Sequence, residues 1–251
     1  MRRRVLFKCA VAAALLTSIS PSVFAQQDEV VVGCNTSFLP FEFKQGNQYV
    51  GFDIDLWTEI ARGLGIKWRL QPMDFSGLIP ALETRNVDVV LAGLYIRDER
   101  KKVIDFSDPY YQSGYSAVVR VDTRGLNTAA DLQGKSVGAE TGTATVDYLE
   151  HSLKNVDIHQ YPNIVNALLE LQTGRVDAVV HDTPNLLYYA NTEGKGKVRL
   201  IEPPLENGYA YGIGFQKGSK LVAPVDAELA RMKADGRYKQ IYRKWFGKDP
   251  S

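Results

Sequence analysis

The sequence predicts an α/β protein with two domains built on one plan. The chain has 251 residues, 45% of them hydrophobic and 24% charged, which is typical of a soluble globular protein with room for one large domain or two modest ones. Apolar strands alternate with amphipathic helices over residues 30–93, and a second alternation runs over 131–201. The segments VDVVLAG (87–93) and VDAVVH (176–181) are alike, which indicates a shared plan.

The first 25 residues have the pattern of a secretory signal peptide. A basic start at 2–8 precedes an apolar stretch at 9–16, and the small-x-small signature at 23–25 predicts cleavage after Ala25. The apolar stretch is far shorter than the roughly 20 residues that cross a bilayer. Loss of the four basic residues of this leader changes the net charge from +1 to about −3, which removes the electrostatic basis for nucleic-acid binding.

The two cysteines do not predict a disulfide framework. Cys9 leaves with the leader, so Cys34 has no partner within the mature chain in an oxidising compartment. Cys9 also stands at the start of the apolar region, whereas the cysteine of a lipoprotein would follow that region. Because Cys34 comes just after the valines at 30–32, we expect a small buried residue in or just after a strand.

The first domain is expected to begin with a β-branched strand and to continue as alternating strands and helices. Apolar residues recur at helical spacing after Asp53, which can cap the helix, and Gly65 is placed to end it. Gly46-Asn47 predicts a hairpin turn between two extended segments. The expected strands are 30–34, 38–44, 49–51, 66–70 and 87–92, with helices at 53–64 and 76–84.

The second domain follows a connector rich in turn residues at 105–114. A break at Pro203-Pro204 then separates it from a carboxyl-terminal segment of one strand and two helices. The expected strands are 116–121, 136–139, 156–160, 176–180, 198–201 and 211–215, with helices at 144–153, 163–173, 184–191, about 220–234 and 236–246.

Motifs of several enzyme classes are absent, so we expect no cofactor, no metal and no enzymatic activity. The triplet Gly134-Lys135-Ser136 lacks the upstream glycine of a phosphate-binding loop, because position 129 is Ala. The three histidines lie far apart, without the cysteine partners of a zinc site, and there is no GxSxG motif. Ligand binding in a cleft between the domains is then the default expectation.

Five segments carry a resemblance to a known family: LPFEFKQGNQYVGFDIDLW (39–57), PMDFSGLIPALETRNVD (72–88), RDERKKVIDFSDPYYQSG (97–114), HDTPN (181–185) and YRKWFG (242–247). The sequence resembles the periplasmic glutamine-binding proteins of polar amino-acid ABC transporters, which belong to bacterial solute-binding protein family 3. The resemblance implies a type II periplasmic-binding-protein fold, in which two α/β lobes joined by a two-strand hinge close on a ligand in the cleft between them.

The resemblance also implies a domain division, a location and a partner. The large lobe would be 26–109 plus 211–251, the small lobe 115–205, and the hinge 110–114 and 206–210. The protein would be a periplasmic monomer that delivers an amino acid to an ABC transporter membrane permease. A sensory role would require a separate receptor.

Residue by residue, the resemblance places a ligand site. Arg100 of the DER segment would clamp the ligand's α-carboxylate, and Asp182 of HDTPN would bind its α-ammonium. The alternatives are a solvated charge at Arg100 and a helix cap at Asp182. The other implied site residues are the aromatic walls Phe38 and Phe75, Ala92 and Gly93 at the end of a strand, and His181 beside the ligand's side chain.

Four positions depart from the glutamine-binding pattern: Asn35, Tyr95, Glu140 and Ala144, where the family has an acidic residue, Thr, Lys and Gly. Together they make the cleft about one charge unit more negative. Overall similarity favours glutamine as the single ligand, whereas the substitutions favour a basic amino acid or an amino-acid conjugate. Glu140 could also pair with Arg97 as a latch across the cleft. The enzymatic alternative is a cyclohexadienyl-dehydratase-like activity, with Glu140 and His181 as the acid–base pair.

Overall fold

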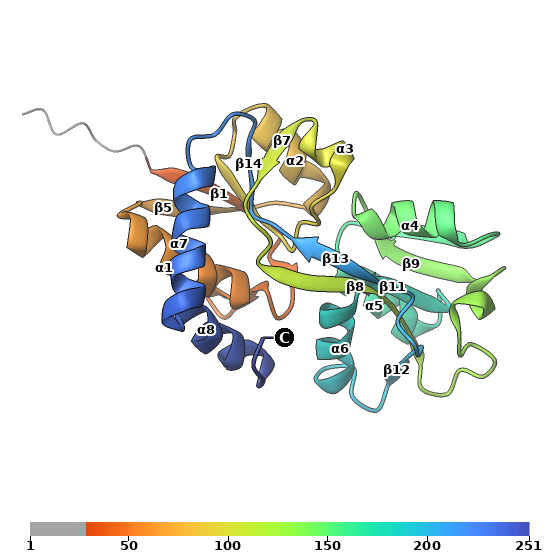
Figure 1. The fold of residues 1–251 in the computed structure, drawn as a ribbon. Coiled ribbons are helices and arrows are strands. Elements are labelled where there is room, and N and C mark those ends of the chain that lie inside the picture. Colours follow the sequence, from red (N-terminus) through yellow and green to blue (C-terminus); the bar gives the residue numbers. More distant parts are fainter. Residues whose placement is uncertain (1–28, 251) are drawn as a thin grey trace, which may run out of the picture.

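The computed structural model describes residues 29–250 as two α/β lobes, each built around its own sheet (Figure 1). The leader predicted at residues 1–25 lies outside the described residues. In the first sheet the strand order is β5-β1-β6-β14-β7, with β1 parallel to β5 and β6, and β14 antiparallel to β6 and β7. Its strands are β1 (Val30–Cys34), β5 (Trp68–Pro72), β6 (Val89–Leu91), β7 (Ile104–Phe106) and β14 (Gly214–Gln216).

Helices and a small hairpin complete the first lobe. Its helices are α1 (Phe52–Leu64), α2 (Phe75–Glu83), α3 (Asp98–Lys101), α7 (Val222–Asp235) and α8 (Arg237–Phe246). The hairpin is a separate three-stranded sheet of β2 (Ser37–Phe38), β3 (Glu42–Gln45) and β4 (Gln48–Val50). Figure 1 shows α7 and α8, from the end of the chain, lying beside α1, which comes from the beginning of the chain.

The second sheet has the order β10-β9-β11-β8-β12, with β13 paired to another part of β8. Its strands are β8 (Tyr111–Arg120), β9 (Ser136–Glu140), β10 (Asp157–Tyr161), β11 (Ala178–Asp182), β12 (Val198–Leu200) and β13 (Glu206–Tyr211). The helices are α4 (Ala144–Ser152), α5 (Ile164–Thr173) and α6 (Thr183–Asn191), with a short 3₁₀ turn, η1 (Ala129–Leu132).

The antiparallel pair of β8 and β13 carries the chain from one lobe to the other and back (Figure 1). Gly114 lies opposite Asn207 in this pair. A Cβ atom at Gly114 would lie 2.1 Å from the carbonyl oxygen of Glu206, so only glycine allows the two backbones to approach this closely.

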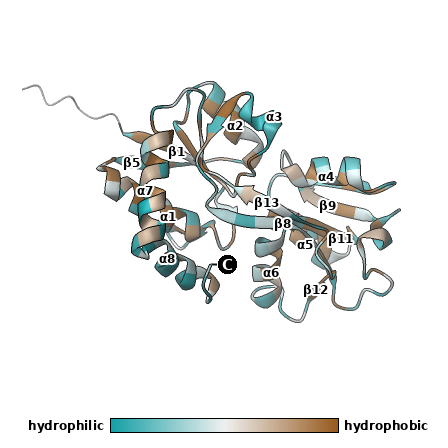
Figure 2. Cartoon of the chain, in the orientation of Figure 1, coloured by the Kyte–Doolittle hydropathy of each residue, from teal (hydrophilic) through white to brown (hydrophobic). Residues whose placement is uncertain are grey.

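Each lobe buries an apolar core between helices and sheet. Helix α1 turns Leu56, Trp57 and Ile60 inward, and all three are fully buried. Figure 2 shows hydrophobic residues concentrated along α2, whereas α8 is largely hydrophilic on the side facing the viewer. Cys34 is buried and unpaired at the end of β1, which confirms the prediction for this residue.

Three local predictions are wrong. The strand expected at 211–215 is two strands, because β13 ends at Tyr211 in one sheet and β14 begins at Gly214 in the other. No element was predicted at 98–101, where α3 lies, and β7 runs into the segment 105–114 that was expected as connector. Asp53 does not cap α1, since the helix begins at Phe52 and the Asp53 side chain lies buried inside the lobe.

Candidate functional site

Ten of the eleven candidate residues line one cavity between the lobes, together with Thr143. Arg100 is the candidate that is not part of this lining. The lining residues are Asn35, Phe38, Phe75, Ala92, Gly93, Tyr95, Glu140, Thr143, Ala144, His181 and Asp182. The cavity measures about 10 Å³, which is about the space that one water molecule needs. An amino acid therefore needs the lobes to separate or side chains to move.

Six residues of the cavity come from the carboxyl ends of parallel strands. β1 and β6 are parallel neighbours in the first sheet, and β9 and β11 are parallel neighbours in the second. Such strand ends are where open α/β sheets usually bind ligands. The residues placed there are Asn35 after β1, Ala92 and Gly93 after β6, Glu140 at the end of β9, and His181 and Asp182 at the end of β11.

Phe38 forms an aromatic wall that requires a glycine opposite it. Its ring stacks on Phe41 at 5.1 Å between centroids and lies 5.4 Å from the His181 ring. Gly93 has a φ of 51°, and a Cβ atom there would lie 2.4 Å from Phe38 Cε1. Glycine is therefore required at position 93 both by the backbone conformation and by the close approach of Phe38.

Glu140 joins residues of both lobes in one buried network. Asn35 Nδ2 donates to Glu140 Oε1 at 2.7 Å across the cleft, and His181 Nε2 lies 3.1 Å from Glu140 Oε2. Burial alone would lower the pKa of His181, but the hydrogen bond to Glu140 and the charges of Asp182 and Glu140 outweigh it and raise that pKa. His181 therefore binds its proton more tightly beside Glu140 than burial alone would allow.

Asp182 faces two tyrosines. The Tyr211 hydroxyl donates to Asp182 Oδ2 at 2.6 Å, and burial raises the pKa of Asp182 against the lowering effects of His181 and Tyr211. Asp182 stands at the N-cap position of α6 but makes no side-chain capping hydrogen bond, which contradicts the helix-cap alternative. The Tyr95 hydroxyl donates to the carbonyl of Gly114 at 3.1 Å, so its ring spans from the cleft to the β8–β13 pair.

Arg100 is a buried cation with few partners. Its side chain belongs to α3 and is 8% exposed, which contradicts the solvated-charge alternative. Nη1 donates to the Tyr95 carbonyl at 3.3 Å, and the guanidinium lies 5.6 Å from the centre of the Phe75 ring. No carboxylate lies within ion-pair distance of it among residues 29–250. Burial, helped by the charge of Arg97, lowers the pKa of Arg100 to about 10.

The latch proposed between Glu140 and Arg97 is wrong in its partners. Arg97 Nη1 binds Asp147 Oδ2 of α4 at 2.6 Å, and Arg97 also pairs with Glu99, while Glu140 is taken by Asn35 and His181. The Arg97–Asp147 pair still joins the two lobes, but it is 26% and 51% exposed and contributes little to stability.

Sequence reasoning missed Tyr211 and Thr143. Thr143 donates through its hydroxyl to the Glu140 carbonyl at 2.7 Å and lines the cavity at the start of α4. A hydroxyl at the N-cap position of a predicted helix, directly after a strand, could have indicated it. Tyr211 gave no such signal, because its partner Asp182 lies in another sheet segment.

Two acidic residues lie buried behind the cavity. Glu42 and Asp53 are both 0% exposed, and neither carboxylate oxygen of Glu42 has a hydrogen-bond partner in the part of the chain that the structure describes. Burial, followed by the charge of Asp53, raises the pKa of Glu42 well above its usual range. Burial raises the pKa of Asp53 to about 6, although Asp53 Oδ2 accepts hydrogen bonds from Tyr110 at 2.7 Å and from the Gly93 amide at 3.4 Å.

Because Glu42 and Asp53 have raised pKa values, we expect their contribution to the free energy of unfolding to fall as the pH rises. A carboxyl whose folded pKa exceeds its unfolded value binds its proton more tightly in the folded state, so the free energy of unfolding falls from about pH 4 upward. For Asp53 this loss is complete once the pH exceeds about 6. Glu42→Gln removes one of the two carboxyls and is expected to raise the free energy of unfolding at neutral pH by about 1–3 kcal/mol.

Denaturant unfolding at about pH 5 and about pH 8 measures this effect. Glu42→Gln should flatten the pH dependence, whereas Glu83→Gln at the exposed end of α2 should leave it unchanged. An equal slope in the Glu42 variant and the wild type would contradict the assignment.

The described residues contain no group of three or more His, Cys, Asp or Glu side chains placed to hold a metal ion. Over the same residues, no helix combines the length and apolarity that crossing a bilayer requires.

The chain matches known proteins along nearly its whole length. The model of the bacterial extracellular solute-binding proteins, family 3, matches residues 30–248. The L-arginine-binding protein of Pseudomonas aeruginosa is 32% identical over 253 residues, covering 96% of this chain and 97% of that protein. The L-cystine-binding protein TcyJ of Escherichia coli strain K12 is 30% identical over 251 residues, covering 95% and 94%. The structure of an ancestral arginine-binding protein bound to glutamine superposes with a TM-score of 0.84 and 40% identity, covering 88% of this chain and 98% of that one.

Proposed function

The chain belongs to the bacterial extracellular solute-binding proteins of family 3, and we propose that it binds a basic amino acid, with arginine as the first candidate, and delivers it to a membrane permease. In this proposal the protein is exported through its leader and acts as a monomer in the periplasm. Glutamine is the competing ligand.

Arg100 is the observation that carries the proposal. The Arg100 guanidinium is 8% exposed, makes a single hydrogen bond and has no acidic partner among residues 29–250. Burial of such a charge costs free energy unless an anion binds to it. The α-carboxylate of an amino acid matches its fork of donors. Asp182, buried in the same cleft, is suited to the α-ammonium.

Glu140 supports a cationic side chain over a neutral one. It is 1% exposed and adds a carboxylate to a cleft that already contains Asp182. The names of the relatives point in the same direction, since the P. aeruginosa protein binds arginine, although an ancestral arginine-binding protein is also known bound to glutamine. The proposal further assigns the hinge to 110–114 and 206–210, where β8 and β13 pair between the lobes.

A ligand panel tests the proposal directly. Mature protein is unfolded, stripped of ligand and refolded, and its thermal midpoint is measured with arginine, lysine, glutamine and cystine, because a ligand that binds only the folded state stabilises it. We expect arginine to give the largest shift and to be recovered chemically unchanged. A larger shift with glutamine would overturn the choice of ligand, and conversion of an added compound such as prephenate would overturn the binding role.

The variant Glu140→Gln distinguishes arginine binding from glutamine binding. Removal of this charge is expected to weaken arginine binding by about 10- to 100-fold and glutamine binding by less than about threefold, because only arginine carries a side-chain cation. Titration calorimetry measures both affinities. Asp147→Asn, at the exposed edge of the cleft, is the control and should change both by less than about threefold. Equal losses for both ligands would reduce Glu140 to a structural role.

A further inference from the structure

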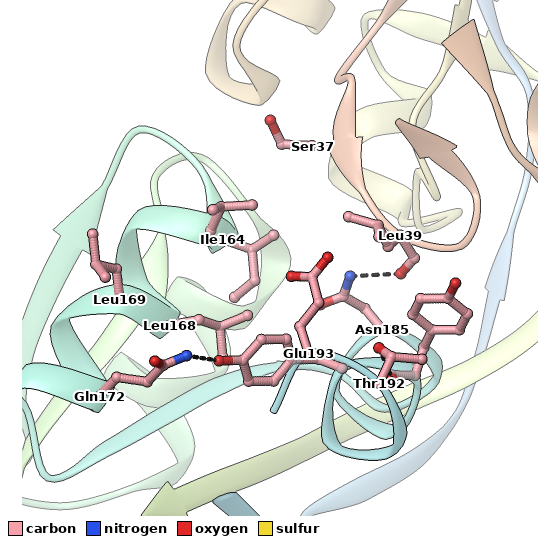
Figure 3. Close-up of a pocket in the computed structure, with 12 residues that line it drawn as sticks. Ser37, Leu39, Ile164, Leu168, Leu169, Gln172, Asn185, Thr192 and Glu193 are labelled. Carbon is pink, nitrogen blue, oxygen red and sulfur yellow. Dashed lines mark hydrogen bonds between the residues drawn. The ribbon is translucent and has the colours of Figure 1, made fainter. Parts of the chain in front are cut away.

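A second cavity lies where the two lobes meet, away from the candidate site (Figure 3). It measures about 150 Å³, a volume that can hold a benzene-sized molecule. Ser37 and Leu39 line it from the first lobe, and helices α5 and α6 line it from the second. Its walls are mostly apolar and include Ile164 and Leu168.

Asn185 joins the two lobes in the wall of this cavity. Asn185 is 3% exposed, and its Nδ2 donates to the Leu39 carbonyl at 2.6 Å, the bond drawn across the cavity wall in Figure 3. This bond fixes the orientation of the amide. Asn185 Oδ1 has no donor among residues 29–250, but protein atoms cover it, so a ligand in the cavity does not reach it.

The mouth of the cavity is acidic. Glu193 lines it with an exposed side chain and has no cation within ion-pair distance in the described part of the chain. Burial raises the pKa of the lining residue Tyr189, opposed by a hydrogen bond from Gln172, and the charge of Glu193 raises it further. The lining therefore combines mostly apolar walls with one carboxylate at the mouth.

We propose that this cavity is a second binding site, for a small molecule with an apolar body and a protonated amine. The apolar body would fill the space beside Leu168, and the ammonium would pair with the Glu193 carboxylate at the mouth. An arylalkylamine has this size and chemistry.

Binding of such a ligand would be coupled to amino-acid binding in the main cleft. Because the cavity is lined by both lobes, a bound amine contacts both and favours the arrangement in which they are together. An amino acid held between the lobes favours the same arrangement, so each ligand should increase the affinity of the other by the same factor, about two- to tenfold. The second site does not depend on which amino acid the main cleft binds.

Phenethylamine is the probe for the test, added to the mature protein and followed by titration calorimetry and amide NMR shifts. We expect a dissociation constant on the order of 1 mM and shifts in α5 and α6. Ethylbenzene, which lacks the amine, should bind at least about threefold more weakly. Glu193→Gln should weaken phenethylamine binding by about three- to tenfold.

Two valines of equal exposure provide a matched pair of variants. Val165 lines the cavity and is 50% exposed, whereas Val121 is 52% exposed and lies outside the cavity. Val165→Trp should weaken phenethylamine binding by at least about tenfold, because the indole covers the mouth, and Val121→Trp should leave it unchanged.

Three outcomes would overturn the proposal. Equal binding to both tryptophan variants would place the amine elsewhere on the surface. Displacement of phenethylamine by arginine would place it in the main cleft. Equal affinity for ethylbenzene would show that Glu193 does not take part in recognition.

Discussion

Arg100→Met is expected to weaken arginine binding by roughly 100-fold or more while leaving the folded protein at least as stable as the wild type. The methionine keeps an apolar stem against Phe75 but removes the charge and the donor fork that would bind the α-carboxylate. Because the guanidinium is buried without an acidic partner among residues 29–250, its removal relieves a desolvation cost in the ligand-free protein. Calorimetric titration and thermal unfolding measure the two effects.

The neighbouring Arg97 supplies the control. Arg97→Met breaks an exposed ion pair with Asp147 and should change arginine affinity by less than about fivefold. Arg100→Lys should resemble the methionine variant, since an ammonium lacks the fork geometry. Retention of affinity within about fivefold in Arg100→Met would show that the α-carboxylate binds elsewhere.

Gly51→Ala is expected to destabilise the protein by about 4 kcal/mol or more. Gly51 has a φ of 143° and stands between the hairpin and α1, where the chain passes close to itself. A Cβ atom there would lie 1.9 Å from the Phe41 carbonyl oxygen, which already accepts a hydrogen bond from the Asp53 amide. Neither backbone segment can move without breaking this contact.

Gly46→Ala is the control for a positive φ without a steric clash. Gly46 also has a positive φ, of 60°, but a Cβ atom there meets nothing within 4 Å. Its alanine variant should lose only about 1 kcal/mol. Similar losses in the two variants, measured by urea unfolding, would attribute the effect at Gly51 to backbone conformation and not to the clash.

Most of the fold could be predicted from the sequence, because its long elements carry strong periodicity. The apolar stripe of α1 and the β-branched strand β1 are local signals that do not depend on distant partners. The division of 211–215 into β13 and β14 could not be predicted, since it depends on pairing with β8 in one sheet and with β6 and β7 in the other. Strands of three residues such as β7 have too few positions to show a period.

The candidate site depended on the resemblance to a family more than on pattern. The periodicity of the sequence predicts only that Phe38 and His181 are buried. Their positions relative to the segments that resemble the family indicated that both lie in the cleft. Charge alone suggested that Glu140 pairs with Arg97, but it could not reveal that Asn35 and His181 lie nearer. The role of Tyr211 beside Asp182 follows from the three-dimensional structure alone.

The strand order of the first sheet also affects how the chain can fold as it is made. β14 lies between β6 and β7, yet residues 214–216 are synthesised long after 89–91 and 104–106. The second sheet is drawn from one continuous stretch, 111–211, and can be complete while the first is still open at its fourth position. A nascent chain released before residue 214 would therefore present one finished lobe and one with an unpaired strand edge, which is a site for association with other chains.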